Sequence, residues 1–577
     1  MDTMRPMGAE VTVSGDGMRV WHLDAGVLHV CDVPSGHARE LGTGIEDYGA
    51  DRTGETLVWS NGGSLNLVVK GDLTQLRTPG PALRARPDPS GRRIGYLTGG
   101  TVRVIREDGS DDLLAGEEEG VRWGETDPAS RFFGRREGWW WAPDGECILA
   151  TRIQGDQVSL HLLDLDGGWV DVHWDREIYP YLGIVRWADG SPLITVLRRS
   201  QSHGLVLAVD RRTGETQVHA ELADPRWVNP ILGTPRHLAD GRVLVGGEIA
   251  HDGYDARCLF ADGTLLTPPG LYVRRVVGRL GPRAAGGELG ELLIEATESE
   301  PAEQHLYRVR GASSGAMVVH RLTTAPGWHT AECAGDTVVT GFRSWQHEAT
   351  QWVVTHAGAV ITELSGHVPA VSTHPAVERV TDRKLPTAVL YPPGHVFGRR
   401  LPVLLMLPET PTQQQVRADH QAFAEAMPWV ASGFAVVFVD GRGTLGVSPS
   451  FEKVTHRRLA DLASSDQIDA LRALADKHSD LDLSRVVALG QGYGGWLAAL
   501  LGSRRPDAVQ TAISVAPWDW AAIPVPLAER YLGPRDVESE VYARHDLDEL
   551  PPSVLILPEF NQAAVASFLA SRASTTA

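Results

Sequence analysis

The sequence predicts two domains: an N-terminal all-β region of the β-propeller type and a C-terminal α/β domain with a mostly parallel sheet. From the N-terminus to about residue 370, short apolar runs with a two-residue period alternate with turns rich in Gly, Asp and Ser. After His374-Pro375, continuous apolar strands alternate with helical segments. A chain of 577 residues also exceeds one ordinary core. We therefore expect a propeller over residues 1–375 and an α/β domain over 376–577.

The N-terminal region shows its strand pattern most clearly where turn signals flank the apolar runs. The length of this region and the loose recurrence of an Asp/Gly turn followed by a strand favour a propeller over a sandwich. The repeat is too degenerate to give a blade count. Representative strand runs are 18–23, 27–30, 57–60, 92–97, 102–105, 158–164 and 351–354.

The C-terminal region reads as successive β-α-β units. Residues 459–477 have the apolar spacing of an amphipathic helix, and a second helix is expected over 494–501. Such alternation predicts a mostly parallel sheet with helices on both faces. The expected strands are 401–407, 434–440, 485–489, 512–515 and 553–557.

Bulk composition excludes several classes of function. The 54 basic and 73 acidic residues give a net charge of −19, which argues against nucleic acid or an anionic membrane as a partner. The first seven residues carry no apolar signal-peptide core, and no apolar run reaches membrane-spanning length. The cysteines are far apart, which predicts reduced thiols in a cytoplasmic protein, and no metal or other cofactor is expected. They are Cys31, Cys147, Cys258 and Cys333.

The most informative motif is a glycine-dense turn between an apolar strand and a helix, at residues 486–501. A strand–turn–helix of this kind is the context of the nucleophile elbow, G-x-S-x-G, of α/β-hydrolases. Gly490 and Gly494 supply the frame of the motif, and Gly492 occupies the position of the nucleophile. Glycine has no side chain that could attack a substrate.

Together these motifs resemble the dipeptidyl peptidase IV branch of the prolyl oligopeptidase serine peptidase family, over nearly the whole chain. The resemblance implies a β-propeller paired with an α/β-hydrolase domain. The segments that carry it are 138–145, with its W-W-x-P-D-G pattern, 440–444, 466–470, 490–495, 516–517 and 529–533.

The catalytic positions implied by the resemblance have changed. The family requires a serine at the elbow, a histidine to take its proton and an aspartate to orient that histidine. Gly492 stands at the serine position, and residues 558–577 contain no His or Asp, so the hydrolase domain is expected to be shortened at its C-terminal end. His545 and Asp546 precede the last expected strand and are poor substitutes for the base and acid.

Substrate-binding positions depart from the family as well. Pro408 falls where the family has its oxyanion tyrosine. Arg131-Phe132 falls where it has the two glutamates that hold a substrate's amino terminus, and an arginine would repel that ammonium. Trp520 matches a family tryptophan, whereas Ile523 and Leu527 lie near expected tyrosines. A residual ligand site would comprise Tyr493, Gly494, Trp520, Arg131 and Phe132.

Two interpretations of the elbow remain open. The backbone N–H groups of Tyr493 and Gly494 could serve an anion or a carbonyl oxygen at the helix N-terminus. Alternatively, the glycines serve only close packing of strand and helix. We expect Asp440, Arg442, Asp466 and Asp469 to hold the fold, and residues 139–141 to pack between blades instead of forming a binding ledge.

The leading hypothesis is a cytoplasmic, catalytically inactive peptidase homologue. It would bind a peptide, a small molecule or a protein partner, including a homo-oligomer or an active relative. One alternative is an enzyme with altered chemistry in the cavity between propeller and hydrolase. Another is an interaction platform built on the propeller.

Overall fold

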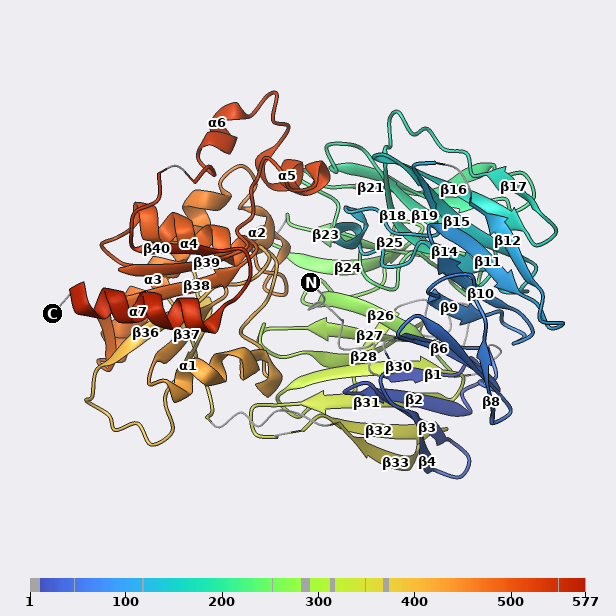
Figure 1. Cartoon of the computed structure of the whole chain (residues 1–577), viewed down its shortest axis with the longest axis horizontal. Coiled ribbons are helices and arrows are strands. Elements are labelled where there is room, and N and C mark those ends of the chain that lie inside the picture. The colour runs from blue at the N-terminus through green and yellow to red at the C-terminus, as the bar shows by residue number, and fades with distance from the viewer. Residues whose placement is uncertain are drawn as a thin grey trace.

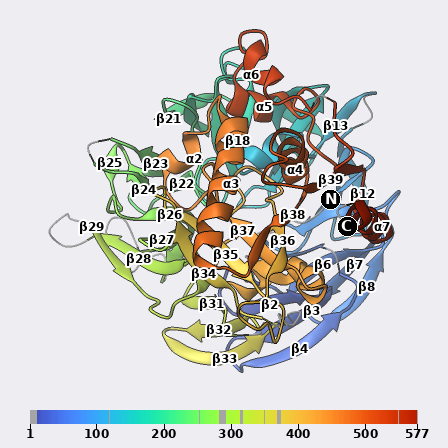
Figure 2. The ribbon, with the colours of Figure 1, turned by 90° about the vertical axis from the view of Figure 1, so that its left-hand side faces the viewer.

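The computed structural model describes residues 11–45, 47–116, 119–251, 253–281, 291–311, 317–347, 349–366, 373–547 and 549–575. Two bodies lie side by side in Figure 1, an all-β body and an α/β body. Viewed from the α/β side, the β-sheets form a ring behind it (Figure 2). Both predicted domain types are present.

The all-β body is a propeller of eight blades within the described residues. Seven antiparallel sheets form it, and one of them joins two meanders, β22–β25 and β26–β29, through a short parallel pairing of β24 with β26. The first four blades contain β1 (Val11–Val13), β2 (Arg19–Asp24), β3 (Val27–Asp32), β4 (His37–Gly42); β5 (Asp47–Ala50), β6 (Thr56–Asn61), β7 (Ser64–Val69), β8 (Asp72–Leu76); β9 (Leu83–Pro87), β10 (Ile94–Thr98), β11 (Thr101–Ile105), β12 (Asp111–Ala115); β13 (Val121–Trp123), β14 (Trp139–Trp141), β15 (Cys147–Gln154), β16 (Gln157–Asp164) and β17 (Gly168–Asp171). The last four contain β18 (Tyr181–Arg186), β19 (Leu193–Leu197), β20 (His203–Val209), β21 (Thr216–Ala223); β22 (Arg236–His237), β23 (Val243–Ile249), β24 (Ala256–Ala261), β25 (Thr264–Leu265); β26 (Tyr272–Leu280), β27 (Glu291–Thr297), β28 (His305–Gly311), β29 (Met317–Arg321); β30 (Trp328–Ala334), β31 (Thr337–Arg343), β32 (Gln351–His356) and β33 (Ala359–Ser365).

The first strand of each blade is the innermost. Strands β5 and β9 contact each other, as do β26 and β30, and β30 contacts β1 to close the ring. The fourth strands β4, β8 and β21 are largely exposed, whereas β18 is largely buried. The innermost strands therefore surround the central channel that a propeller has.

The tryptophans of β14 pack between blades. The space beside Gly95 of β10 is filled by the rings of Trp139 and Trp141, which meet edge to face with centroids 6.3 Å apart. Trp141 donates its indole N–H to the carbonyl oxygen of Arg86 in β9, at 3.1 Å. These contacts favour packing over a binding ledge.

The α/β body is built on one sheet of seven described strands in the order β34-β35-β37-β36-β38-β39-β40. From β37 through β36, β38 and β39 to β40 the pairings are parallel, while β34 and β35 pair antiparallel at one edge. The strands are β34 (Ala376–Val380), β35 (Leu385–Leu390), β36 (Leu401–Met406), β37 (Ala435–Val439), β38 (Leu481–Gln491), β39 (Thr511–Val515) and β40 (Val554–Leu557).

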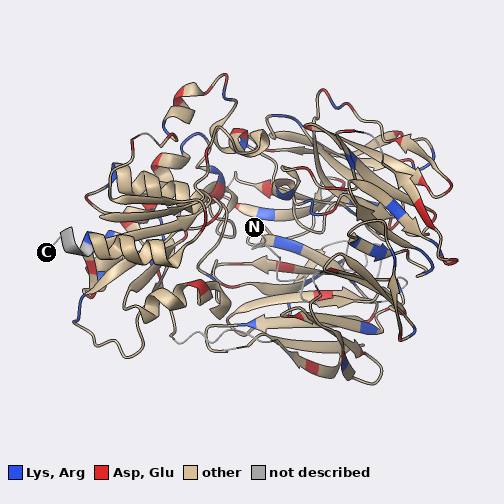
Figure 3. Cartoon of the chain, in the orientation of Figure 1, with Lys and Arg blue, Asp and Glu red and all other residues tan. Residues whose placement is uncertain are grey.

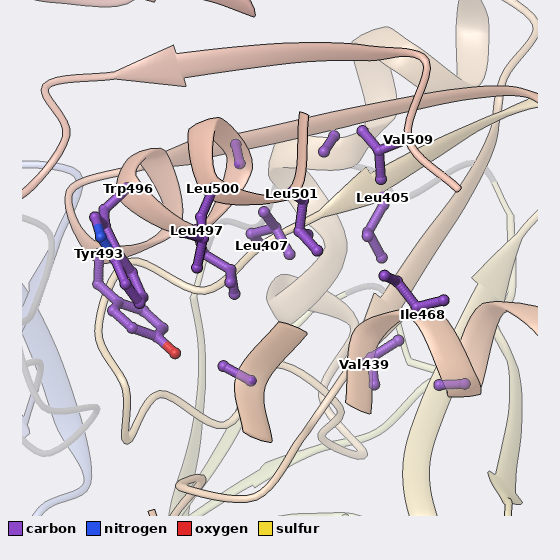
Figure 4. Close-up of a cluster of buried hydrophobic side chains, with 14 of the residues drawn as sticks. Leu405, Leu407, Val439, Ile468, Tyr493, Trp496, Leu497, Leu500, Leu501 and Val509 are labelled. Atoms are coloured by element: carbon purple, nitrogen blue, oxygen red, sulfur yellow. The ribbon is translucent and has the colours of Figure 1, made fainter. Parts of the chain in front are cut away.

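Helices cover both faces of this sheet. Alternate residues of β36 point to opposite sides: Val403 and Leu405 pack with α3 and α4, whereas Leu404 packs with η3, α1 and α7. Figure 4 shows the first of these cores, with Tyr493 and Trp496 side by side at the start of α4. The helices are η2 (Ser130–Phe133, in the propeller), η3 (His420–Ala426), α1 (Met427–Ala431), α2 (Pro449–Lys453), α3 (Leu459–Lys477), α4 (Tyr493–Arg504), α5 (Val525–Leu532), α6 (Ser539–Ala543) and α7 (Gln562–Thr575).

Two buried carboxylates, one after β37 and one in α3, fix the loops around the sheet. Asp440 is 1% exposed and accepts the backbone N–H groups of Gln415 and Val416, at 2.8 and 3.0 Å. Asp466 is fully buried in α3 and binds the guanidinium groups of Arg442 and Arg383. These carboxylates satisfy backbone and arginine donors, so they have the structural role expected of them.

Candidate active site at the nucleophile elbow

Strand β38 ends at Gln491 and α4 begins at Tyr493, so Gly492 alone forms the turn between them. Its φ of 60° and ψ of −118° are angles that a side chain rarely permits. The Gly492 N–H donates to the Val515 carbonyl at 3.0 Å, and its carbonyl accepts from the Trp518 N–H at 3.0 Å. The sharp backbone of a nucleophile elbow is therefore present at the carboxyl end of a central parallel strand.

The space in front of the elbow is occupied by the chain itself. A Cβ atom at position 492 would lie 3.2 Å from the carbonyl oxygen of Glu409 and 3.2 Å from the indole nitrogen of Trp518. The same Glu409 carbonyl accepts the backbone N–H of Tyr493 at 3.1 Å. In an α/β-hydrolase the N–H after the nucleophile belongs to the oxyanion hole. Here it is already paired.

The segment after β36 makes this closure possible. Leu407 donates its N–H to the Leu489 carbonyl at 2.9 Å, and the chain then runs across the start of α4. A Cβ at Gly494 would lie 2.6 Å from the carbonyl oxygen of Pro408. Pro408 thus contributes backbone packing at the place where the family resemblance predicts a side-chain hydrogen-bond donor.

An aromatic cluster fills the region beside the elbow. Trp520 is 3% exposed, and its ring lies 5.4 Å from that of Trp496 and 5.6 Å from that of Trp518. Tyr493 meets Trp518 edge to face at 5.9 Å, and burial raises the pKa of its phenol. The structure therefore brings Tyr493 and Trp520 together, as members of a packed cluster.

His545 belongs to the same cluster and is engaged on both ring nitrogens. Its imidazole is 2% exposed and stacks on Trp496 with centroids 5.4 Å apart. Nδ1 lies 2.7 Å from the Val541 carbonyl, and Nε2 accepts the Ala460 N–H at 3.1 Å, which assigns the proton to Nδ1. Burial lowers the pKa of His545 to about 4. A neutral imidazole with both nitrogens occupied has none left to act as a base.

Arg131 and Phe132 lie on η2, at the contact between propeller and α/β domain. Phe132 packs against the core of the α/β domain, and Arg131 is exposed. The Phe132 carbonyl lies 3.5 Å from the buried guanidinium of Arg530 in α5, which also donates from Nε to Gln201 at 2.8 Å. The structure thus places η2 beside α5.

Buried charges join the two bodies at a site that sequence reasoning missed. The Lys453 ammonium pairs with Asp224 and Glu248 of the propeller and donates to the Trp227 carbonyl at 2.7 Å. Glu452 accepts both of its bonds, each of 3.1 Å, from the Asn229 amide. Burial, and then the charge of Glu248, raise the pKa of Glu452 to about 7. Partners more than 200 residues apart leave no local pattern in a sequence.

Comparison with known proteins shows which family this arrangement resembles. The sequence profile of the prolyl oligopeptidase family matches residues 420–550. "Probable dipeptidyl-aminopeptidase B" of Aspergillus terreus is 26% identical over 390 residues, covering 60% of this chain and 41% of the relative. Dipeptidyl peptidase 8 of Homo sapiens is 26% identical over 291 residues, covering 46% and 32%. The crystal structure of Porphyromonas gingivalis dipeptidyl peptidase 4 superposes with a TM-score of 0.78 at 17% identity, covering 100% of this chain and 93% of that one.

The chain is similar to the dipeptidyl peptidases of the prolyl oligopeptidase family in the profile over residues 420–550, in its sequence relatives and in its fold. The predicted resemblance and the predicted fold are both confirmed. The chain spans about two fifths of the length of the Aspergillus relative that it matches.

Two further properties concern the described residues of the chain. They contain no group of three or more His, Cys, Asp or Glu side chains placed to hold a metal ion. Among them there is also no helix with the length and hydropathy needed to cross a membrane.

Proposed function

We propose that this chain is a catalytically inactive homologue of the dipeptidyl peptidases, which binds a ligand or partner instead of cleaving a peptide. One observation carries the proposal. The elbow holds Gly492 in place of a nucleophile, and the Tyr493 N–H beside it is bonded to the Glu409 carbonyl.

Serine-type hydrolysis needs a nucleophile, a base within hydrogen-bond reach and donors aimed at the developing oxyanion. Position 492 supplies no nucleophile, and the first oxyanion donor is satisfied by the chain itself. His545 is committed to Val541 and Ala460. These losses concern different elements of one site, which supports a role without hydrolysis.

The packing between the two bodies also favours binding over altered chemistry. Trp227 of the propeller is 1% exposed and belongs to the core of the α/β domain. Lys453 and Arg530 are buried at the same contact. Side chains thus fill this part of the contact, which leaves a modified enzyme less room for a substrate there. The partner we propose is a peptide, a small molecule or a protein, including a second copy or an active relative.

The direct test is activity of the purified full chain. We expect no release of chromophore from dipeptidyl-proline anilides and no covalent label from a fluorophosphonate probe, with an active dipeptidyl peptidase as the positive control. Turnover above the buffer rate, abolished by heat treatment, would overturn the proposal.

Restoring a hydroxyl at the elbow provides a sharper test. In Gly492→Ser the new side chain meets Glu409 and Trp518, so we also combine it with Trp518→Ala to give the hydroxyl room. We expect neither variant to hydrolyse the anilides, because the hydroxyl lacks a base and the Tyr493 N–H stays paired. Mass spectrometry after fluorophosphonate treatment provides the readout. A label on residue 492 would reveal a base that the proposal denies.

A further inference from the structure

The loop between β35 and β36, residues 391–400, carries two neighbouring apolar side chains at the surface. Phe397 is 83% exposed and Val396 is 71% exposed, and no other large apolar side chain of the described residues exceeds these values. We call these two residues the apolar tip. Removing a phenyl and an isopropyl group from water is favourable, so the apolar tip is a place where contact with another surface stabilises the contact.

A buried carboxylate beneath the apolar tip holds it in place. The Oδ2 atom of Asp480 lies 2.9 Å from Nε2 of His395, and its Oδ1 atom accepts the Gly398 N–H at 2.7 Å. One carboxylate thus fixes the residues on both sides of the tip. The His395 ring also stacks on that of Tyr391, with centroids 5.0 Å apart and planes 8° apart. Because both flanks are fixed, the tip is held away from the domain surface, and a contact made there needs little further ordering of the chain.

The apolar tip lies at the end of the sheet opposite the elbow. Its loop leads directly into β36, and Leu401 at the start of β36 pairs with Leu481 at the start of β38. The tip is therefore at the amino end of the parallel strands, whereas the elbow follows the carboxyl end of β38. The carboxyl end also meets the propeller, where Gln414, after β36, accepts a hydrogen bond from Arg274 of β26 at 2.7 Å. The tip thus belongs neither to the elbow nor to this contact between the two bodies.

Three arginines surround the apolar tip with positive charge at the surface. Arg399 and Arg400 follow it in the chain, Arg485 donates to the Arg400 carbonyl at 3.5 Å, and all three are exposed. The carboxylates of this region, Asp480 and Asp482, are buried. Asp482 pairs with Arg485 at 2.7 Å and with Arg400 at 3.6 Å. Elsewhere basic and acidic positions are interspersed over both bodies (Figure 3). The surface beside the tip is therefore basic in a chain whose net charge is −19.

We propose that the apolar tip binds the surface of an anionic lipid membrane, with its phenyl and isopropyl groups in the interfacial region and the three arginines at the headgroups. Apolar side chains flanked by arginines match the bilayer interface, which offers acyl chains to the first and anionic groups to the second. A convex tip also needs no preformed pocket in a fluid surface. The net charge of −19 opposes attraction of the whole molecule, so the contact is confined to this end of the α/β body. It is independent of the elbow and of the proposed loss of catalysis.

Sedimentation of the full chain with vesicles of equal parts phosphatidylcholine and phosphatidylserine, at low ionic strength, tests this surface. We expect wild type to pellet with these vesicles and to bind vesicles of phosphatidylcholine alone about fivefold more weakly or less. Phe397→Ser should weaken binding to the anionic vesicles about tenfold, because less apolar area enters the interface. Arg399→Gln should weaken it about fivefold, because one headgroup contact is lost.

A pair of valines provides the matched control. Val396→Ser should weaken binding about fivefold. Val537→Ser, which alters an exposed valine between α5 and α6, should bind like wild type. All of the changed side chains are exposed, so the variants should fold, and urea unfolding checks that they do.

Hydrogen exchange locates the contact independently of the affinity. With anionic vesicles present, backbone exchange should slow in peptides covering residues 391–400 and stay unchanged in peptides covering the elbow, residues 488–496. Failure of wild type to pellet, equal binding by Phe397→Ser, equal binding to neutral and anionic vesicles, or slowed exchange confined to other segments would each overturn the proposal. So would a wild-type dimer, formed without vesicles, that Phe397→Ser dissociates, because the tip would then contact a second copy of the chain.

Discussion

At the residue scale, Gly492 and His545 show how a hydrolase site can keep its geometry while its polar groups are redirected. Gly492 retains the φ of 60° of the elbow, and the atoms around it are the Glu409 carbonyl and the Trp518 indole. His545 keeps a full set of hydrogen bonds, all of them to backbone groups. Both residues are explained by the folding of the α/β domain alone.

Replacing His545 should therefore damage stability. In His545→Ala the stacking on Trp496 is lost, and the Val541 carbonyl and Ala460 N–H are left without a buried partner. We expect a loss of about 2–4 kcal/mol in the free energy of unfolding. Urea denaturation measures it, with the exposed His173→Ala as a control that should change stability by less than about 0.5 kcal/mol. Equal effects of the two substitutions would refute a structural role.

The same histidine predicts a pH dependence. The folded pKa of about 4 lies below the ordinary value of 6.5, so protons bind preferentially to the unfolded chain. The contribution is fully present above pH 6.5 and is lost as the pH falls toward 4, by up to about 3 kcal/mol. Unfolding free energies at pH 7 and pH 5 should differ less in His545→Ala than in wild type. An unchanged difference would show that His545 is not buried as a neutral group.

At the element scale, the turn from β38 to α4 depends on glycines for contact between backbones. A Cβ on Gly490 would lie 2.3 Å from the Gly494 carbonyl carbon, and one on Gly495 would lie 2.4 Å from the Val515 carbonyl oxygen. Backbone cannot move aside as a flexible side chain can. These distances support the packing interpretation of the motif and explain why the glycines persist without a nucleophile.

Alanine substitutions separate packing from conformation at this turn. We expect Gly490→Ala and Gly495→Ala to cost more than about 3 kcal/mol, because rigid backbone must shift. Gly492→Ala should cost about 1–3 kcal/mol, since its contacts are longer and the main penalty is the positive φ. Gly168→Ala, with open space and no positive φ, is the matched control. Denaturant unfolding gives the ranking, and a Gly492→Ala cost above that of Gly490→Ala would contradict it.

The spacing of apolar residues predicted the helices and strands well, because that spacing reflects which side of each element is buried. The apolar face of residues 459–477 appears as α3 with the same bounds, and the strand expected over 485–489 lies within β38, which is buried over 486–490. The blade count escaped prediction because turns, not a strict repeat, separate the strands. The family resemblance located Gly492, but the Glu409 carbonyl that pairs with Tyr493 is a backbone contact, which no side-chain pattern records.

At the scale of the whole molecule, charged side chains connect the propeller to the α/β domain both at buried and at exposed positions. Lys453 is 4% exposed and pairs with Asp224 and Glu248 across the interface. Arg379 pairs with Glu300 at 3.1 Å, and their side chains are 34% and 46% exposed. Removing one partner from a buried ion pair leaves the opposite charge buried and unpaired, whereas an exposed ion pair contributes little to stability.

This contrast predicts unequal effects of two interface substitutions. Lys453→Met removes the cation between Asp224 and Glu248, of which Glu248 keeps only Arg257 at 3.5 Å. We expect it to cost about 3–5 kcal/mol and to separate the unfolding of the two bodies into two transitions. Arg379→Met should cost less than about 1 kcal/mol and keep the wild-type unfolding profile. Calorimetry and urea unfolding followed by tryptophan fluorescence measure both. If the two variants behave alike, the buried lysine does not hold the domains together, and the interface must depend on apolar contacts such as that of Trp227 with the α/β core.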